Sequence, residues 1–127
     1  MSDKFENLLK QLKKAFVKFK EIMQEKKNEI VRDSAIQRFE FTFELAWKAM
    51  KAYLEEKRGA KELYFPKDVI KNAFQAGILE DDPNWSKMAE TRNLTSHLYK
   101  ESMAESAYST FSSYLPLIDK LIKELEK

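Results

Sequence analysis

With 127 residues, 43% of them hydrophobic, the chain can bury one core, so a single domain over residues 1–127 is expected and global disorder is excluded. Only two Gly and three Pro argue against a many-stranded β fold, whereas abundant Lys, Glu, Ala and Leu favour long helices. The formal net charge of +2 gives no strong case for nucleic acid, zero Cys excludes disulfides and thiol catalysis, and one His argues against a multi-His metal site.

The first 27 residues predict a helix with one apolar face. Apolar residues recur at helical spacing over 5–23, and Ser2 or Asp3 can cap the start. Eight Lys stand against four acids in this segment, which indicates either a solvated bundle face or a weak surface for RNA or a partner. The segment lacks the apolar core of a signal peptide, and no run in the chain approaches the roughly 20 apolar residues of a membrane span. A cytoplasmic protein without a membrane segment is therefore expected.

A second helix is predicted to follow Asn28, which is a plausible N-cap, and to run to about Arg58, where Gly59 ends it. This helix is apolar on two sides. One broad stripe extends over 36–54, and a second lies roughly opposite and consists of Phe41, Leu45, Ala49 and Ala52. A helix with two apolar sides has two neighbours to pack against. We predict a homodimer with this helix at or near the two-fold interface, and the alternative is a helix buried on both sides within one bundle.

A narrow polar strip separates the two stripes and contains Glu40 and Glu44. Because they are four residues apart on a helix, their carboxylates repel mildly unless a cation lies between them. Lys48 can pair with Glu44 within the same helix. Alternatively, one of the two carboxylates meets Arg92 from a neighbouring helix.

Three further helices are expected in the rest of the chain. Pro66 suits the first position of a short helix, and Asp82-Pro83 predicts the start of the next one. The last helix is expected to start near Ser102, with Glu105 completing a capping box. The predicted fold is therefore all-α, a four-helix up-and-down bundle with an additional short helix.

The segment from Arg92 to Tyr99 contains the only histidine, His97, and the residues best suited to phosphate chemistry. On a helix that starts at Pro83, Arg92 falls on the core-facing stripe, so its charge must be paired or must line a cleft. Glu40 and Glu44 are the candidate partners within the chain. His97 would lie about 140° away from Arg92 on an unbroken helix.

Arg92 and His97 can therefore act on one phosphate only if the helix unwinds after about Leu94, or if two subunits pool their residues. Unwinding is favoured here because three side chains compete with helical backbone hydrogen bonds, namely those of Asn93, Thr95 and Ser96. Asn93 could also hydrogen-bond a phosphate or orient a neighbouring side chain.

The spacing of Arg92, His97 and Tyr99 resembles the R-x4-H-x-Y motif of the HEPN superfamily. Within that superfamily the chain is most similar to the nucleotidyltransferase substrate-binding proteins, and its Phe/Glu-rich helix over 37–48 resembles the corresponding helix of that family. The resemblance covers nearly the whole chain, and the motif is its more specific part. It implies a helical subunit that pairs with a separately encoded minimal nucleotidyltransferase, in a two-component system of the toxin–antitoxin kind.

Three functions are compatible with this resemblance. On the first, the chain is the substrate-binding or nucleotide-accepting subunit: Tyr99 receives AMP, and the partner supplies ATP and Mg²⁺, since this chain has no Gly-rich phosphate loop and no acidic metal triad. On the second, it is a metal-independent ribonuclease toxin in which Arg92 stabilises charge and His97 moves protons, with AMP on Tyr99 silencing it. Asn93, Glu40 and Glu44 are then supporting residues. On the third, it is a helical module that binds a nucleotide or protein without chemistry.

Overall fold

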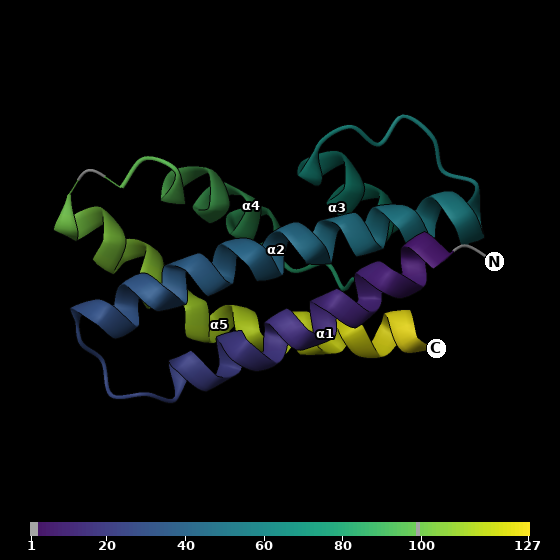
Figure 1. Cartoon of the computed structure of the whole chain (residues 1–127). Helices are drawn as coiled ribbons and strands as arrows, with labels where there is room; N and C mark the ends of the chain where they lie inside the picture. Colours follow the sequence, from purple (N-terminus) through teal and green to yellow (C-terminus); the bar gives the residue numbers. More distant parts are fainter. Residues whose placement is uncertain (1–2, 99) are drawn as a thin grey trace.

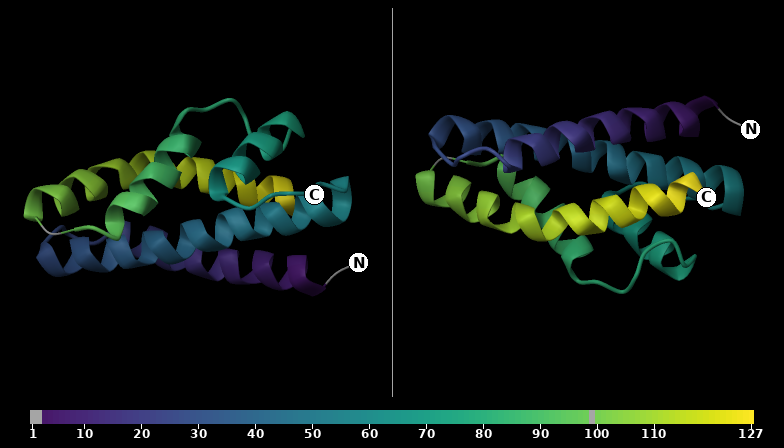
Figure 2. Two further views of the ribbon diagram at one scale, coloured as in Figure 1. Left: turned by 90° about the horizontal axis from the view of Figure 1, so that it is seen from above. Right: turned by 90° about the horizontal axis from the view of Figure 1, so that it is seen from below.

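The computed structural model describes residues 3–98 and 100–127. Over these ranges the chain forms five helices and no strand (Figure 1): α1 (Asp3–Met23), α2 (Glu29–Arg58), α3 (Pro66–Gln75), α4 (Asn84–Thr95) and α5 (Glu101–Glu126). The long helices α1, α2 and α5 run beside one another, and α3 and α4 lie along another side of α2 (Figure 2). The predicted all-α bundle with an additional short helix is confirmed.

Helix α2 is the central element, because it packs against each of the other four helices. The connection between α4 and α5 lies at the same end of the bundle as the turn between α1 and α2 (Figure 1). The start of α1 and the end of α5 lie at the opposite end. The described part of the motif, residues 92–98, therefore lies at one end of the bundle, beside the first turns of α2.

Helix boundaries follow the capping residues read from the sequence. The side chain of Asn28 accepts a hydrogen bond from the backbone N–H of Val31 at 2.8 Å, and Gly59 adopts a left-handed conformation with φ of +66°. Pro66 is the first residue of α3. Pro83 occupies the N-cap position of α4, and the side chain of Asp82 just before it accepts a hydrogen bond from the backbone N–H of Asn84 at 2.9 Å. Both ends of α2 and the starts of α3 and α4 are thus confirmed within one or two residues.

The predicted capping box of the last helix is wrong. Helix α5 begins at Glu101, one residue from the predicted start near Ser102, but its N-cap position, Lys100, has no side-chain cap. Glu105 does not turn back toward the helix start, because its carboxylate pairs with Arg32 and Lys27 of other parts of the chain. Two cations outcompete a backbone N–H for this carboxylate.

Aromatic side chains from three helices form the centre of the core. Phe39 of α2 lies against Phe111 of α5, with ring centroids 4.7 Å apart, and against Phe19 of α1 at 6.0 Å. Phe43 and Tyr114 complete the cluster at 6.1 and 5.8 Å from Phe39. Because these rings are fully or almost fully buried, they fix α1, α2 and α5 relative to one another.

The second apolar stripe of α2 is divided between the bundle and its surface. Ala49 and Ala52 are buried and Leu45 is half-buried, as the one-bundle alternative requires. Phe41 at the other end of the stripe is 57% exposed.

Among the helices of the described ranges, none combines the length and the apolar character that a bilayer crossing demands.

Candidate functional site

Helix α4 carries Arg92 on the face that packs against the bundle. Trp85, Met88 and Ala89 precede it at helical spacing and are buried, as the periodicity predicts. The Arg92 side chain is only 28% exposed. A guanidinium in this position must be paired.

Two carboxylates on consecutive turns of α2 pair with Arg92. Its Nη1 lies 3.1 Å from Oε2 of Glu40, and its Nε lies 3.5 Å from Oε1 of Glu44. The predicted contact between Arg92 and this polar strip is confirmed, and it involves both carboxylates rather than one. The Nε is buried and makes no hydrogen bond within the described residues, so the contact with Glu44 is an ion pair without good hydrogen-bond geometry.

Glu40 also binds the last residue of α4. The buried hydroxyl of Thr95 lies 2.9 Å from Oε2 of Glu40 and 2.7 Å from the carbonyl oxygen of Arg92. Sequence reasoning treated Thr95 only as a residue that loosens the helix. Its position three residues after Arg92, on the same face, was the available signal for a direct role.

Glu44 is held by neighbours on its own helix. The indole N–H of Trp47 donates to its Oε2 at 3.2 Å, and the ammonium group of Lys48 lies 3.9 Å away. The predicted pairing with Lys48 is therefore present in addition to the pairing with Arg92. Helical periodicity places Trp47 on the apolar stripe, and its polar edge gives it this second contact.

The helix ends between Arg92 and His97. Helix α4 stops at Thr95, and the backbone N–H groups of Ser96 and His97 donate to the carbonyl oxygens three residues earlier, at 3.3 and 2.9 Å. His97 is exposed in the turn that follows. The predicted unwinding is confirmed to within a residue, and it removes the constraint of an unbroken helix on the direction of the imidazole.

The remaining predicted site residues lie on either side of this turn. Asn93 is exposed, and its carbonyl oxygen accepts a hydrogen bond from the hydroxyl of Ser96 at 2.7 Å. Leu98 is half-buried against the core. Tyr99 lies outside the described residues. The structure thus brings Arg92, Glu40 and Glu44 together and presents His97 just beyond the end of their helix.

This arrangement of side chains can transfer protons and stabilise negative charge. The imidazole of His97 can take or give a proton, and the guanidinium of Arg92 can stabilise negative charge. Two carboxylates orient Arg92 and offset its charge, so the three charged groups together sum to −1. Within residues 3–98 and 100–127, no group of three or more His, Asp or Glu side chains is placed to hold a metal ion.

The chain matches a family model described as nucleotidyltransferase substrate binding protein like, over residues 3–127. It is 31% identical over 105 residues to a Haemophilus influenzae protein named probable ribonuclease HepT, an alignment that covers 77% of this chain and 72% of that protein.

Two solved structures are similar to the whole fold. A crystal structure of a Thermus thermophilus protein superposes with a TM-score of 0.84 and 37% identity, covering 91% of this chain and 99% of the other. A Haemophilus influenzae structure, described as showing the fold of a substrate binding domain of a nucleotidyltransferase, has a TM-score of 0.78 and 27% identity. It covers 94% of this chain and 99% of that protein.

Proposed function

Because the chain belongs to the nucleotidyltransferase substrate binding protein like family, we propose that it is the substrate-binding or nucleotide-accepting subunit of a separately encoded minimal nucleotidyltransferase. The observation that carries this proposal is the family match over residues 3–127, which includes the whole Arg92–Tyr99 segment. The pair forms a two-component system of the toxin–antitoxin kind. ATP and Mg²⁺ are bound by the partner, which has the metal-dependent chemistry.

The accepting group is the phenol of Tyr99. Its oxygen attacks the α-phosphorus of ATP, the bond to the β-phosphate breaks, and pyrophosphate leaves. The phenolic proton passes to a base on the partner, and the product is AMP joined to Tyr99 through a phosphodiester. The placement of the motif at a tip of the bundle supports this role, because a second protein can approach the α4–α5 connection from outside (Figure 1).

Intact mass spectrometry tests the accepting role. The chain is mixed with the co-encoded nucleotidyltransferase, ATP and Mg²⁺, and the mass of one or more AMP groups is expected on a peptide that contains Tyr99. Tyr99→Phe should abolish the addition. Tyr64→Phe is the matched control, since Tyr64 is 67% exposed on the α2–α3 connection. An unchanged mass of the wild-type chain, or addition that survives Tyr99→Phe, would contradict the proposal.

A second candidate function is metal-independent cleavage of RNA, favoured by the 31% identity to a protein named as a probable ribonuclease. In this reaction the ribose 2′-hydroxyl attacks the adjacent phosphorus and the 5′-oxygen of the next nucleotide leaves, which gives a cyclic phosphate. His97 moves the protons, and Arg92 stabilises the charge that develops on the phosphate oxygens. AMP on Tyr99, two residues from His97, then silences the nuclease.

Cleavage needs both a base and an acid, so the ribonuclease function goes with the proposed homodimer, in which two copies of His97 share one cleft. Unmodified wild-type protein should cleave RNA without added metal, and His97→Ala should reduce the rate by about a hundredfold or more. If the unmodified protein leaves RNA intact while Tyr99 accepts AMP, only the first function stands. If neither activity is found, the chain is a non-catalytic binding module.

A further inference from the structure

One row of residues on α2 contacts the end of α4 and the start of α5, the two helices on either side of the motif turn. The row consists of four residues at spacing four, which follow one another along a ridge of the helix: Arg32, Ile36, Glu40 and Glu44. Glu40 and Glu44 bind Arg92 and Thr95 at the end of α4. At the other end of the row, Arg32 binds the first turn of α5. The segment over 96–100, which carries His97 and Tyr99, connects these two attachment points.

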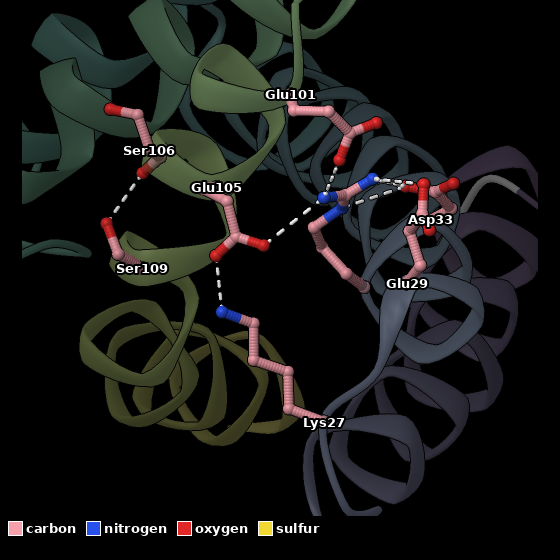
Figure 3. Close-up of polar contacts among 8 residues, drawn as sticks. Lys27, Glu29, Asp33, Glu101, Glu105, Ser106 and Ser109 are labelled. Carbon is pink, nitrogen blue, oxygen red and sulfur yellow. Dashed lines mark hydrogen bonds and ion pairs between the residues drawn. The ribbon is translucent and has the colours of Figure 1, made fainter.

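Arg32 is buried, with an exposed fraction of 4%. Its Nη1 lies 2.5 Å from Oε2 of Glu101 and 3.2 Å from Oε1 of Glu105, and its Nε and Nη2 donate to Asp33 at 3.0 and 2.9 Å. The other oxygen of Glu105 binds the ammonium group of Lys27. Figure 3 shows Glu101 and Glu105 on α5 facing Asp33 and Glu29 on α2.

The charge distribution keeps this cluster ionised. A hydrogen bond from Arg32 holds the pKa of Glu101 below its usual range, and hydrogen bonds from Lys27 and then Arg32 do the same for the pKa of Glu105. The same carboxylates raise the pKa of Arg32. The ion pairs therefore persist throughout the neutral range.

The middle of the row and the segment line a common pocket. Ile36 is buried and lines one shallow pocket together with Arg32, Leu98 and Lys100. Leu98 is half-buried and packs against the core. Leu98, the residue that follows His97, thus lies across this pocket from the part of α2 between Arg32 and Glu40.

Arg32 is one of several attachments of α5 to the bundle. Further attachments are made deeper in the core, by buried residues such as Phe111, Tyr114 and Ile118. Burying a guanidinium is costly, and its partners Glu101 and Glu105 are 69% and 43% exposed, which weakens the ion pairs through solvent screening. An apolar side chain would serve the stability of this site at least as well. The structure thus points to a role for Arg32 in the α4–α5 connection beside it rather than in the stability of the whole bundle.

We propose that Arg32 is a positioning residue for the site on the α4–α5 connection. By fixing Glu101 and Glu105 to α2, it holds the far end of the 96–100 segment, while Glu40 holds the near end through Arg92 and Thr95. The catalytic consequence rests on the proposed function of His97 and Tyr99. The structural consequence, that the start of α5 is fixed to α2, does not depend on that function.

The test compares Arg32→Gln with Arg32→Lys and with Arg58→Gln, which removes the same charge at the far end of α2. Amide hydrogen exchange over 96–104 reports on the segment. The ring proton signals of His97, the only histidine, report on the site. Reaction rates with the co-encoded nucleotidyltransferase, ATP and Mg²⁺ report on function. If Arg32→Gln does not fold, Glu101→Gln removes the 2.5 Å contact from its exposed partner.

Arg32→Gln should accelerate exchange over 96–104, shift the His97 signals and lower kcat for AMP transfer by about tenfold or more, with KM for ATP unchanged. Arg32→Lys should recover part of the loss, because an ammonium group can still pair with one carboxylate. Arg58→Gln should match the wild type. Equal amide exchange over 96–104 in Arg32→Gln and Arg58→Gln would overturn the proposal. Faster amide exchange in Arg32→Gln with an unchanged kcat for AMP transfer would overturn it as well. A wild type that accepts no AMP contradicts the proposed function, and the exchange and His97 signals then decide the positioning role alone.

Discussion

Arg92 shares its charge with two carboxylates of unequal importance. Glu40 makes a 3.1 Å contact with Nη1 and also binds the hydroxyl of Thr95, whereas Glu44 lies 3.5 Å from Nε without a good hydrogen bond. The two carboxylates fix the direction of the guanidinium, and no single carboxylate neutralises its charge. A phosphate at this site must compete with carboxylates that are already in place, which limits the affinity for a polyanion.

At the scale of single residues, Glu40→Gln should destabilise the protein more than Glu44→Gln. The first change weakens two contacts at the end of α4, and we expect a loss of about 1 kcal/mol. The second weakens one long ion pair that is partly exposed, with an expected loss of a few tenths, about 0.3 kcal/mol. Urea unfolding followed by circular dichroism measures both free energies. Equal losses, or the reverse order, would show that Glu40 is not the principal partner of Arg92.

The arginine sites differ in how well the sequence predicts them. Arg92 was predicted to need a carboxylate because it follows Trp85 and Met88 on a buried stripe, and an unpaired buried charge is costly. Arg32 was missed, although it lies four residues before Ile36 on the buried stripe of α2 and the same periodicity applies to it. Its partners on α5, Glu101 and Glu105, could not be read from the pattern, because they are 69 and 73 residues away.

At the scale of helices, local capping signals predicted both ends of α2, whereas the capping box predicted at the start of α5 does not form. Among residues 3–98 and 100–127, no side chain competes with Asn28 and Gly59 in their capping roles, so the local preference decides. Glu105 has the spacing of a capping box, but it faces Arg32 and Lys27 in the folded protein. Tertiary charges therefore override a local signal, and a single sequence gives no direct information about them.

The ion pairs at the start of α5 predict an acid-sensitive stability. Because the pKa values of Glu101 and Glu105 are lowered in the folded protein, their contribution is fully present above the usual carboxyl range and is lost as pH falls through the lowered values. The double variant Glu101→Gln, Glu105→Gln should be less stable than the wild type at pH 7. The difference should shrink below about pH 4.

Thermal unfolding from pH 7 to pH 2 measures this convergence. The pair Glu124→Gln and Asp119→Asn is the matched control, since both acids lie on α5 and bind exposed lysines at the far end of the helix. A difference between the double variant and the wild type that stays constant with pH would contradict the assignment to Glu101 and Glu105.

At the scale of the whole molecule, the exposed part of the second α2 stripe bears on the proposed homodimer. Phe41 is 57% exposed, Leu45 beside it is half-buried, and Val17 of α1 is 49% exposed. The sequence predicted that α2 has two apolar sides, and the structure buries Ala49 and Ala52 within the bundle. Helical periodicity cannot distinguish a neighbour in the same chain from a neighbour in another.

Phe41→Glu should therefore turn a dimer into a monomer, because it places a charge in an apolar contact between two copies of α2. Phe74→Glu is the control, since Phe74 is 45% exposed on α3. Light scattering at micromolar concentrations measures both masses. A wild-type chain at monomer mass over this range, or a dimer that survives Phe41→Glu, would rule out this interface.

The long separation between Arg32 and its partners also has a consequence during synthesis. Arg32 leaves the ribosome 69 residues before Glu101 and 73 before Glu105. Until α5 has emerged, Arg92, His97 and the residues between them are present in the nascent chain, but their C-terminal attachment to α2 cannot form. The chemical groups of the motif are thus translated before the geometry that arranges them. A chain that stops short of α5 would carry the motif without the assembled site.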